Sequence, residues 1–252
     1  SFELAQKRLS ADTVNFSAST SSLQKGESFK DTAQNIEAMK IDAVVMRHPS
    51  PGAPYHLKEF IDAKIINAGD GTHEHPTQAI LDMMSIQEKF GKIKGLNIAI
   101  IGDIYHSRVA RSNMYGLVTM GANVTVCGPP NLIPQEISEL GVNINYNIDE
   151  VVEWADAVNV LRIQRERMGL GLIPSKREYR KLFGITYERM IRRNNELVIL
   201  HPGPMNRGVE IDSEVADSDQ AIILDQVLNG VASRMSILYL LLGAKDGGKN
   251  ED

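Results

Sequence analysis

Short apolar runs that alternate with amphipathic stretches set the pattern of this chain. Five of the runs end on a polar or cationic residue beside glycine or proline, and they occupy positions 43–46, 65–67, 97–101, 158–161 and 197–200. Apolar runs of this length between helical stretches are typical of buried parallel strands. The pattern therefore predicts an α/β fold, in which ligands bind outside the carboxyl ends of the strands.

The spacing of these runs predicts two doubly wound parallel-sheet domains with a cleft between them. In the first series, residues 1–92, we expect strands at 43–46 and 65–66, a candidate strand at 13–16, and helices at 32–39, 55–64 and 77–90. The stretch 91–95, with glycine at both ends, breaks the pattern and is the expected domain junction.

The second series covers residues 93–227. We expect its strands at 97–101, 123–127, 142–146, 158–161, 197–200 and 221–224, and its helices at 107–119, 134–140 and 149–155, with two helical pieces around 176–193. A closing helix is expected at 226–242, and the closing segment 228–252 is expected to pack back on the first domain. The apolar spacing of the first residues is typical of the middle of a helix, so we expect the chain to start inside an element.

Composition narrows the class of partner. The chain has 252 residues, with 27 Lys and Arg against 32 Asp and Glu, which gives a net charge of −5. A mildly acidic surface offers no general attraction to nucleic acid or anionic lipid, so we expect neither as a partner. No apolar stretch of the sequence approaches membrane-spanning length. The single cysteine, Cys127, suits a reducing cytosol, and we expect a cytoplasmic protein.

Positive charge gathers where the apolar runs end. The arginines and histidines that follow the runs are Arg47, His75, Arg108, Arg162 and His201. Because the carboxyl ends of parallel strands meet at one edge of a sheet, these side chains would arrive at one crevice. Such a set predicts a small, multiply anionic ligand.

A tight turn at 69–78 places His75 and Gln78 at the start of the helix expected at 77–90. The free N–H groups at a helix start favour an anion. A purely structural role for His75 stays open. A metal site built on residues 73–75 is disfavoured because the spacing matches no zinc pattern, and we expect no metal.

The loop after the run 97–101 stands where a dinucleotide-binding loop would follow its first strand. It lacks the G-x-G-x-x-G spacing, and the next strand ends in Cys127-Gly128 instead of an acidic residue that would hold a ribose. A nucleotide cofactor is therefore not expected. We expect Arg108 to face the cleft and Arg111, one helical turn further on, to be solvated.

Arg162 directly follows a buried run. A guanidinium at that point can hold a carboxylate with two hydrogen bonds. The arginines at positions 165 and 167 belong to a run of charges and are expected to be solvated.

The loop His201-Pro202-Gly203-Pro204 is rigid and presents carbonyls to an amino or amide group. One of its X-Pro bonds is a candidate for the cis isomer. By contrast, the polar stretch 19–27, taken alone, is typical of a flexible linker.

Taken together, these motifs resemble those of the aspartate carbamoyltransferase family. The matching stretches are S-S-L-Q-K-G-E at 21–27, M-R-H-P at 46–49, N-A-G-D-G…H-P-T-Q at 67–78, G-D…S-R at 102–108, L-R-I-Q-R-E-R at 161–167 and H-P-G-P-M-N-R-G at 201–208. The resemblance runs from residue 1 to the last helix. The related ornithine enzymes differ, since their S-M-G element and H-C-L-P loop do not occur here.

The resemblance implies transfer of a carbamoyl group from carbamoyl phosphate to the α-amine of L-aspartate, early in pyrimidine biosynthesis. It implies no metal and no organic cofactor. It also implies that residues 1–92 form a carbamoyl-phosphate-binding domain and residues 93–227 an aspartate-binding domain. A carbamoyltransferase that acts on another amino acid is the first alternative.

The resemblance further implies a role for each matched residue. The residues implied to bind carbamoyl phosphate are Arg47, His75, Gln78, Gly203 and Pro204, of which Arg47 and His75 are also catalytic. Those implied to bind aspartate are Lys25, Arg108, Arg162 and Gln164. Those implied to reach a neighbouring subunit are Ser21, Ser22 and Lys25, which makes the catalytic unit a homotrimer and replaces the linker interpretation of this stretch. Dihydroorotase or regulatory chains are candidate partners in a larger assembly.

One feature of the family is missing from the sequence. The family carries an S-T-R-T-R motif, which wraps the phosphate, immediately before the segment equivalent to Ser1-Phe2-Glu3, and no such motif occurs here. We therefore expect weak or no activity from residues 1–252 alone. The second alternative follows from this departure: an inactive, truncated chain that acts as a scaffold for pathway partners.

Overall fold

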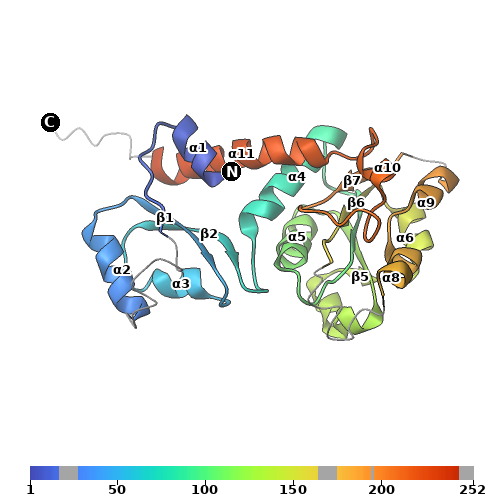
Figure 1. Cartoon of the computed structure of the whole chain (residues 1–252), viewed down its shortest axis with the longest axis horizontal. Helices are drawn as coiled ribbons and strands as arrows, with labels where there is room; N and C mark the ends of the chain where they lie inside the picture. Colours follow the sequence, from blue (N-terminus) through green and yellow to red (C-terminus); the bar gives the residue numbers. More distant parts are fainter. Residues whose placement is uncertain (17–27, 164–174, 194–195, 244–252) are drawn as a thin grey trace. The chain divides into compact units, whose positions relative to one another are not determined.

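The computed structural model describes residues 1–16, 28–163, 175–193 and 196–243. Figure 1 shows an α/β chain with parallel strands, which confirms the expected fold class. The chain divides into two compact units, Ser1–Thr77 with Gly230–Asp252, and Gln78–Asn229. The domain limits at 92 and 227, and the cleft, stay predictions. No helix among the described residues is long and apolar enough to span a bilayer.

The second unit is built on a parallel sheet of five strands in the order β5-β4-β3-β6-β7. The strands are β3 (Asn97–Ile101), β4 (Asn123–Cys127), β5 (Asn143–Ile144), β6 (Ala157–Val160) and β7 (Val198–Leu200). The chain starts at the central strand, moves to one edge through β4 and β5, and returns to the other side through β6 and β7. This order is that of a doubly wound sheet, with its switch point between β3 and β6.

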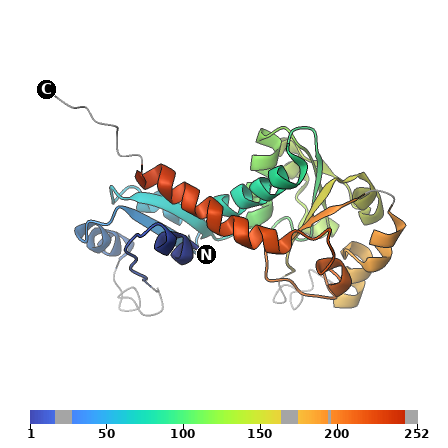
Figure 2. The ribbon, with the colours of Figure 1, turned by 90° about the horizontal axis from the view of Figure 1, so that it is seen from above.

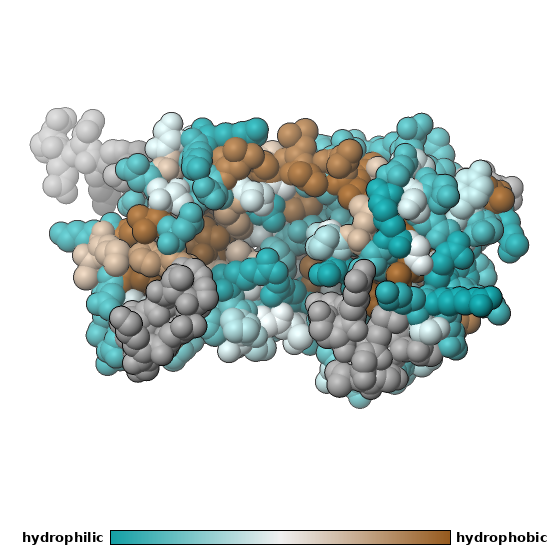
Figure 3. Space-filling view, viewed as in Figure 1, coloured by the Kyte–Doolittle hydropathy of each residue, from teal (hydrophilic) through white to brown (hydrophobic). Residues whose placement is uncertain are grey.

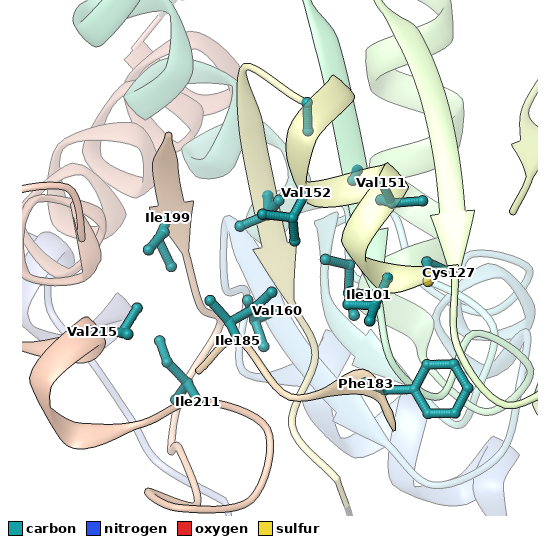
Figure 4. Close-up of a cluster of buried hydrophobic side chains, with 14 of the residues drawn as sticks. Ile101, Cys127, Val151, Val152, Val160, Phe183, Ile185, Ile199, Ile211 and Val215 are labelled. Atoms are coloured by element: carbon teal, nitrogen blue, oxygen red, sulfur yellow. The ribbon is translucent and has the colours of Figure 1, made fainter. Parts of the chain in front are cut away.

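Alternation along the strands explains the core of this unit. In β3, Ile98 and Ile100 join the apolar cluster on one face, whereas Ala99 and Ile101 join the cluster on the other. Because successive side chains of a strand point to opposite faces, a run of consecutive apolar residues is what a sheet covered on both sides requires. Figure 4 shows the second cluster, in which Ile101 lies near Val151 and Val160.

Several helices of the second unit begin at capping residues that the sequence supplies. The helices are α4 (Pro76–Phe90), α5 (Arg108–Thr119), α6 (Ile148–Trp154), α8 (Lys176–Phe183), α9 (Tyr187–Arg192), α10 (Ser213–Ala216) and α11 (Ile223–Leu238). Ser107, Asn147 and Ser175 each accept a backbone N–H of the first turn of the helix that follows. These side chains satisfy donors that a helix start otherwise leaves without partners.

Helix α11 places two amide side chains inward where it belongs to the second unit. Gln226 and Asn229 are about 5% exposed or less, whereas Leu224, Val227 and Leu228 are 62% exposed or more. The outward apolar side chains show as brown atoms along this helix in Figure 3. A surface helix ordinarily has the opposite arrangement, so the inward amides need hydrogen-bond partners in the core.

Four expected elements differ in the structure. Residues 13–16 form no strand, and Val14 and Phe16 are more than half exposed, so this run has no face to bury. At 221–224 only Ala221 pairs, through one bridge to Ile199, and α11 begins two residues later. The helix expected at 55–64 is limited to α3 (Ala53–Leu57), and the one expected at 134–140 is a 3₁₀ helix.

The first unit contains the parallel pair β1 (Ala43–His48) and β2 (Lys64–Asp70), with α1 (Phe2–Arg8) and α2 (Phe29–Ala38). Val45 and Ile66 pack with Ala5 of α1 and with Val231 and Leu238 of α11. On the opposite face the pair packs against Ala33, Leu57 and Ile61. Figures 1 and 2 show these helices on the two sides of the strand pair. The two strands are therefore covered on both faces, like those of the second unit.

Strand β2 ends on Asp70, a buried carboxylate that holds the turn after the strand. Its oxygens accept the backbone N–H groups of Gly52 at 2.7 Å and Glu74 at 3.0 Å, and the side-chain amide of Asn67 at 2.9 Å. Nδ1 of His73 lies 3.0 Å from the same carboxylate. Burial alone would raise the pKa of Asp70, but these hydrogen bonds outweigh it and lower the pKa below its ordinary value.

Replacing Asp70 by asparagine should destabilise the first unit in a pH-dependent way. A carboxylate whose pKa is lowered in the folded state contributes stability above its ordinary pKa and loses that contribution as the pH falls through the folded-state value. We expect Asp70→Asn to lose about 1–3 kcal/mol of the free energy of unfolding at pH 7. The difference in unfolding free energy between Asp70→Asn and the unmodified protein should narrow below about pH 4. Thermal or urea unfolding at several pH values measures this difference.

Asp62→Asn is the matched control, because Asp62 is an exposed carboxylate of the same unit. It should leave the unfolding free energy nearly unchanged. If the difference in unfolding free energy between Asp70→Asn and the unmodified protein stays the same from pH 7 to pH 2, the stabilising role of the ionised Asp70 carboxylate is contradicted.

Strands β3 and β4 approach so closely at their carboxyl ends that only glycine fits. A Cβ atom on Gly128 would lie 2.2 Å from the carbonyl oxygen of Gly102. We expect Gly128→Ala to cost about 3 kcal/mol or more of the free energy of unfolding, because backbone must move. Gly91→Ala is the control, because the added Cβ meets open space there and only the φ of 72° opposes it. It should cost about 1–2 kcal/mol. Equal losses in denaturant unfolding would argue against the close approach.

Candidate active site

In the first unit, Arg47 lies at the end of β1, and His75 lies beyond the turn that follows β2. Arg47 lies on β1 next to an irregularity of the register between Met46 and His48. Its side chain is exposed, and its guanidinium has no hydrogen-bond or ion-pair partner among the residues that the structure describes. A guanidinium in that state is ready to bind an anion.

His75 directly precedes helix α4. Pro76 occupies the first position of this helix, and the ring nitrogen Nδ1 of His75 lies 3.5 Å from the hydroxyl of Thr77. Neighbouring His73 contacts the carboxylate of Asp70. In the described parts of the chain, no group of three or more His, Cys, Asp or Glu side chains could hold a metal ion.

In the second unit, the loop after β3 positions Arg108. Gly102 adopts a φ of 134° and donates its N–H to the carbonyl of Cys127 at 2.8 Å. Asp103, which is 1% exposed, accepts the backbone N–H of His106 at 3.1 Å. Ser107 then caps α5, so that half-buried Arg108 becomes the first residue of the helix. Arg111 is exposed, as the sequence predicts.

Arg162 follows the buried residue Leu161, whose N–H donates to the carbonyl of Ile101 at 2.8 Å. The arginine is exposed, whereas the next residue, Ile163, is buried again. Its guanidinium has no hydrogen-bond or ion-pair partner within the described ranges. The strand end therefore fixes the backbone and leaves the charged group available.

The loop after β7 carries Gly203 and Pro204, both exposed and joined by a cis peptide bond. His201, fully buried, accepts the N–H of Gly203 on Nδ1 at 2.9 Å. Its other ring nitrogen, Nε2, lies 3.4 Å from Oε1 of buried Glu210. Two buried side chains, those of His201 and Glu210, thus lie against the start of the loop.

Glu210 and Asn206 connect this loop to the segment that carries Arg162. Glu210 accepts the backbone N–H of Asn206, and its Oε2 accepts the side-chain amide of Asn206 at 3.2 Å. The same amide donates to the carbonyl of Ile163 at 2.9 Å. The second unit therefore brings the Gly203–Pro204 loop and the Arg162 segment together.

Gln78 lies in the first turn of α4 and is buried. Its Nε2 donates to Oδ1 of Asp82 at 3.0 Å. Asp82 and Glu210 are functional candidates that the sequence analysis missed. For Asp82 a signal existed, since it stands on the apolar side of the helix at 77–90, three residues after Ala79 and four before Ile86.

The predicted site residues divide between the two units. Arg47 and His75 belong to the first unit, and Gln78, Arg108, Arg162, Gly203 and Pro204 belong to the second. Four other predicted residues, Ser21, Ser22, Lys25 and Gln164, lie outside the described residues. Each unit by itself presents cationic and amide groups suited to anions, and the second adds the exposed loop of Gly203 and Pro204.

Family models match most of the chain. Residues 1–88 match the carbamoyl-P binding domain of aspartate/ornithine carbamoyltransferases, and residues 94–241 match the Asp/Orn binding domain of the same family. Together the two matches reach from the first residue to the end of the described helices.

Individual proteins agree with this assignment. The aspartate carbamoyltransferase catalytic subunit of Gemmatimonas aurantiaca is 58% identical over 245 residues, which cover 97% of this chain and 77% of that protein. The structure of aspartate transcarbamoylase from Trypanosoma cruzi with carbamoyl phosphate and aspartate is 30% identical, with a TM-score of 0.80, and the match covers 94% and 77% of the two chains. The catalytic subunit from M. jannaschii is 35% identical with a TM-score of 0.82, over 98% and 81%.

These similarities confirm the resemblance that the motifs indicate. They favour the aspartate enzymes, since the named relative and both solved structures are aspartate carbamoyltransferases. The chain belongs to the aspartate/ornithine carbamoyltransferase family and, within it, to the aspartate carbamoyltransferase catalytic subunits.

Proposed function

We propose that this protein transfers the carbamoyl group of carbamoyl phosphate to the amine of L-aspartate, giving N-carbamoyl-L-aspartate and phosphate in pyrimidine biosynthesis. The observation that carries the proposal is the 58% identity to an aspartate carbamoyltransferase catalytic subunit across 97% of the chain. The placement of cationic and amide side chains at strand ends and at the helix starts that follow them supports it.

Arg47 and His75 act on carbamoyl phosphate. When an amine attacks the carbamoyl carbon, negative charge grows on the carbamoyl oxygen and on the departing phosphate. A guanidinium and an imidazole directed at that charge stabilise the transition state without a covalent intermediate. The unpartnered guanidinium of Arg47 fits this role, because it gives up no internal ion pair when the anion binds.

Gln78 and the Gly203–Pro204 loop recognise the carbamoyl group itself. Its amino group carries two N–H donors and therefore needs acceptors. The exposed loop at Gly203 and Pro204 offers backbone carbonyls, and Gln78 offers a side-chain carbonyl. These three groups belong to the second unit.

Arg108 and Arg162 bind aspartate. Its two carboxylates match two guanidinium groups, each of which can donate a pair of parallel hydrogen bonds. Arg162 has no internal partner among the described residues, and Arg108 is held at a helix start. Gln164 and Lys25 complete the aspartate site in this proposal.

The chemistry needs no side-chain base. The uncharged amine forms the new C–N bond, the bond from the carbamoyl carbon to the phosphate oxygen breaks, and the leaving phosphate takes the amine proton. Holding both substrates in the reactive orientation supplies much of the acceleration. Residues 1–92 bind carbamoyl phosphate and residues 93–227 bind aspartate in this scheme.

The working enzyme is a homotrimer, in which Ser21, Ser22 and Lys25 reach the active site of a neighbouring subunit. Dihydroorotase or regulatory chains are further candidate partners. The cytoplasm is the proposed compartment, and a chain with a single cysteine, which can form no internal disulfide, suits it.

Arg162→Ala should reduce use of aspartate far more than binding of carbamoyl phosphate. Loss of a bidentate charged contact predicts a fall in kcat/KM for aspartate of roughly 100-fold or more, because each charged hydrogen bond contributes about 1.5–3 kcal/mol. The KM for carbamoyl phosphate should stay within about threefold. Steady-state kinetics with each substrate varied in turn measures both.

Arg111→Ala is the matched control, because Arg111 is an exposed arginine of the same unit. It should leave kcat/KM for aspartate and KM for carbamoyl phosphate unchanged. Ornithine in place of aspartate should give no product in the unmodified protein. Turnover of ornithine, or equal effects of the two arginine variants, would argue against the assigned substrate.

Mixing two inactive variants should restore activity if active sites are shared. Chains with Lys25→Ala lack the donated group, and chains with Arg162→Ala lack an aspartate ligand within the chain. In a randomly mixed trimer, roughly a quarter of the sites receive an intact set of residues from two different chains. Dissociation, mixing and reassociation, followed by the carbamoyl-aspartate assay, measures the recovery.

The control mixes each inactive variant with itself by the same procedure and should recover nothing. No recovery in the mixed sample, although light scattering shows reassembly, would mean that Lys25 serves the site of its own chain or none.

A further inference from the structure

A completely buried carboxylate, Asp82, lies one helical turn after Gln78 in α4. Its four hydrogen-bond partners are all side-chain amides. Oδ1 accepts from Gln78 at 3.0 Å and from Gln226 at 2.7 Å. Oδ2 accepts from Asn113 at 2.8 Å and from Asn159 at 3.0 Å. No cation faces this carboxylate among the described residues, so neutral dipoles alone satisfy it.

The amides all present the same end to Asp82. Each contact is made by an amide nitrogen, which can only donate, so both carboxylate oxygens act as acceptors. The carbonyl oxygens of Asn113 and Asn159 have no partner in the described structure, although both are buried. These two amides therefore leave their own acceptors unsatisfied in order to donate to the carboxylate. Asp82 fixes the polarity of every amide around it.

Gln226 links the orientation of its amide, which Asp82 fixes, to the loop after β7. Its Nε2 is held by Asp82, so its Oε1 points the other way, where it accepts the backbone N–H of His201 at 2.9 Å. His201 is the first residue of the loop that ends in Gly203 and Pro204. The inward amide of α11 thus connects the carboxylate to the start of that loop.

Gln78 has the same constraint at the other end of the network. With its NH₂ group held by Asp82, its carbonyl oxygen is the end left for a ligand. A reversed amide would place a carbonyl oxygen against a carboxylate, which is repulsive and leaves both groups without a donor. The orientation of Gln78 is therefore set before any ligand binds.

We infer that Asp82 is a positioning residue that makes the second unit select a carbamoyl group by its N–H donors. It turns the carbonyl of Gln78 towards the carbamoyl amino group, and through Gln226 it fixes the loop whose carbonyls face the same group. This inference rests on the proposed function, in which Gln78, Gly203 and Pro204 bind carbamoyl phosphate.

Acetyl phosphate tests the inference, because it has a methyl group where carbamoyl phosphate has an amino group. A site that offers only acceptors rejects such an analogue, since its buried carbonyls would be left without donors. The quantity to measure is the ratio of the inhibition constant of acetyl phosphate to the KM of carbamoyl phosphate.

Asp82→Ala removes both acceptor oxygens, so nothing then holds the amides of Gln78 and Gln226 in one orientation. The ratio should fall by about tenfold or more, which corresponds to the loss of one hydrogen bond. The KM for aspartate should change by less than about threefold. A purely structural role would lower the melting temperature without changing the ratio.

Asn113→Ala is the matched control for structural damage. It removes a donor from Oδ2 and leaves the contacts of Oδ1 with Gln78 and Gln226 in place. It should lower the melting temperature and keep the ratio within about twofold. All kinetics use the protein expressed from its complete reading frame.

The outcomes separate the two claims. If the unmodified protein makes no carbamoyl-aspartate, the proposed function is wrong and this inference falls with it. If the unmodified protein is active but Asp82→Ala keeps the ratio, or Asn113→Ala changes it equally, only the role of Asp82 is overturned.

A second measurement covers the case in which Asp82→Ala does not fold. In the unmodified protein, the side-chain amide protons of Gln78, observed with ¹⁵N-glutamine labelling, should exchange slowly with water both before and after carbamoyl phosphate is added. Rapid exchange, or protection that appears only with the ligand, would show that Asp82 does not hold this amide in advance.

Discussion

Buried carboxylates that must be supplied with hydrogen-bond donors organise the loops on which this protein depends. Asp70 closes the turn after β2, Asp103 the loop after β3, and Glu210 the loop after β7. Each is about 1% exposed or less, and a carboxylate in such a place is very costly unless its lone pairs are satisfied. Backbone N–H groups of the loops donate hydrogen bonds to these lone pairs, and the hydrogen bonds hold each loop in one conformation.

The partners in these clusters are backbone N–H groups, side-chain amides and the ring nitrogens of His73 and His106. The arginines that follow the strands are not used for this purpose. Arg47 and Arg162 keep their guanidinium groups without internal partners among the described residues. The groups that hold the loops are therefore different from the groups that bind substrate, since the two guanidinium groups stay available for anionic substrates. For a reaction that needs orientation and charge stabilisation more than proton transfer, this division is physically suitable.

Asp82 extends the same device into the core. Its four amide donors come from α4, α5, β6 and α11, so one carboxylate joins four elements of the second unit. It also accounts for the inward-facing Gln226 of α11, in a stretch where Leu224 and Leu228 face outward. A buried polar network that is nearly satisfied specifies one arrangement of its members more strictly than apolar packing does. Here that arrangement fixes which end of each amide is presented.

The sequence by itself determined most of the strands, because consecutive apolar residues of strand length report burial on both faces. It also located Arg47 and Arg162 at strand ends and His75 and Arg108 at the helix starts that follow strands, since that placement is local. Apolar character alone misled at 13–16 and 221–224, because a run becomes a strand only where a sheet offers an edge to pair with. Only the tertiary structure decided which polar residues are buried together. The contact between Asp82 and Gln226 joins positions 144 residues apart, and hydrogen bonding between such distant groups leaves no trace in local periodicity.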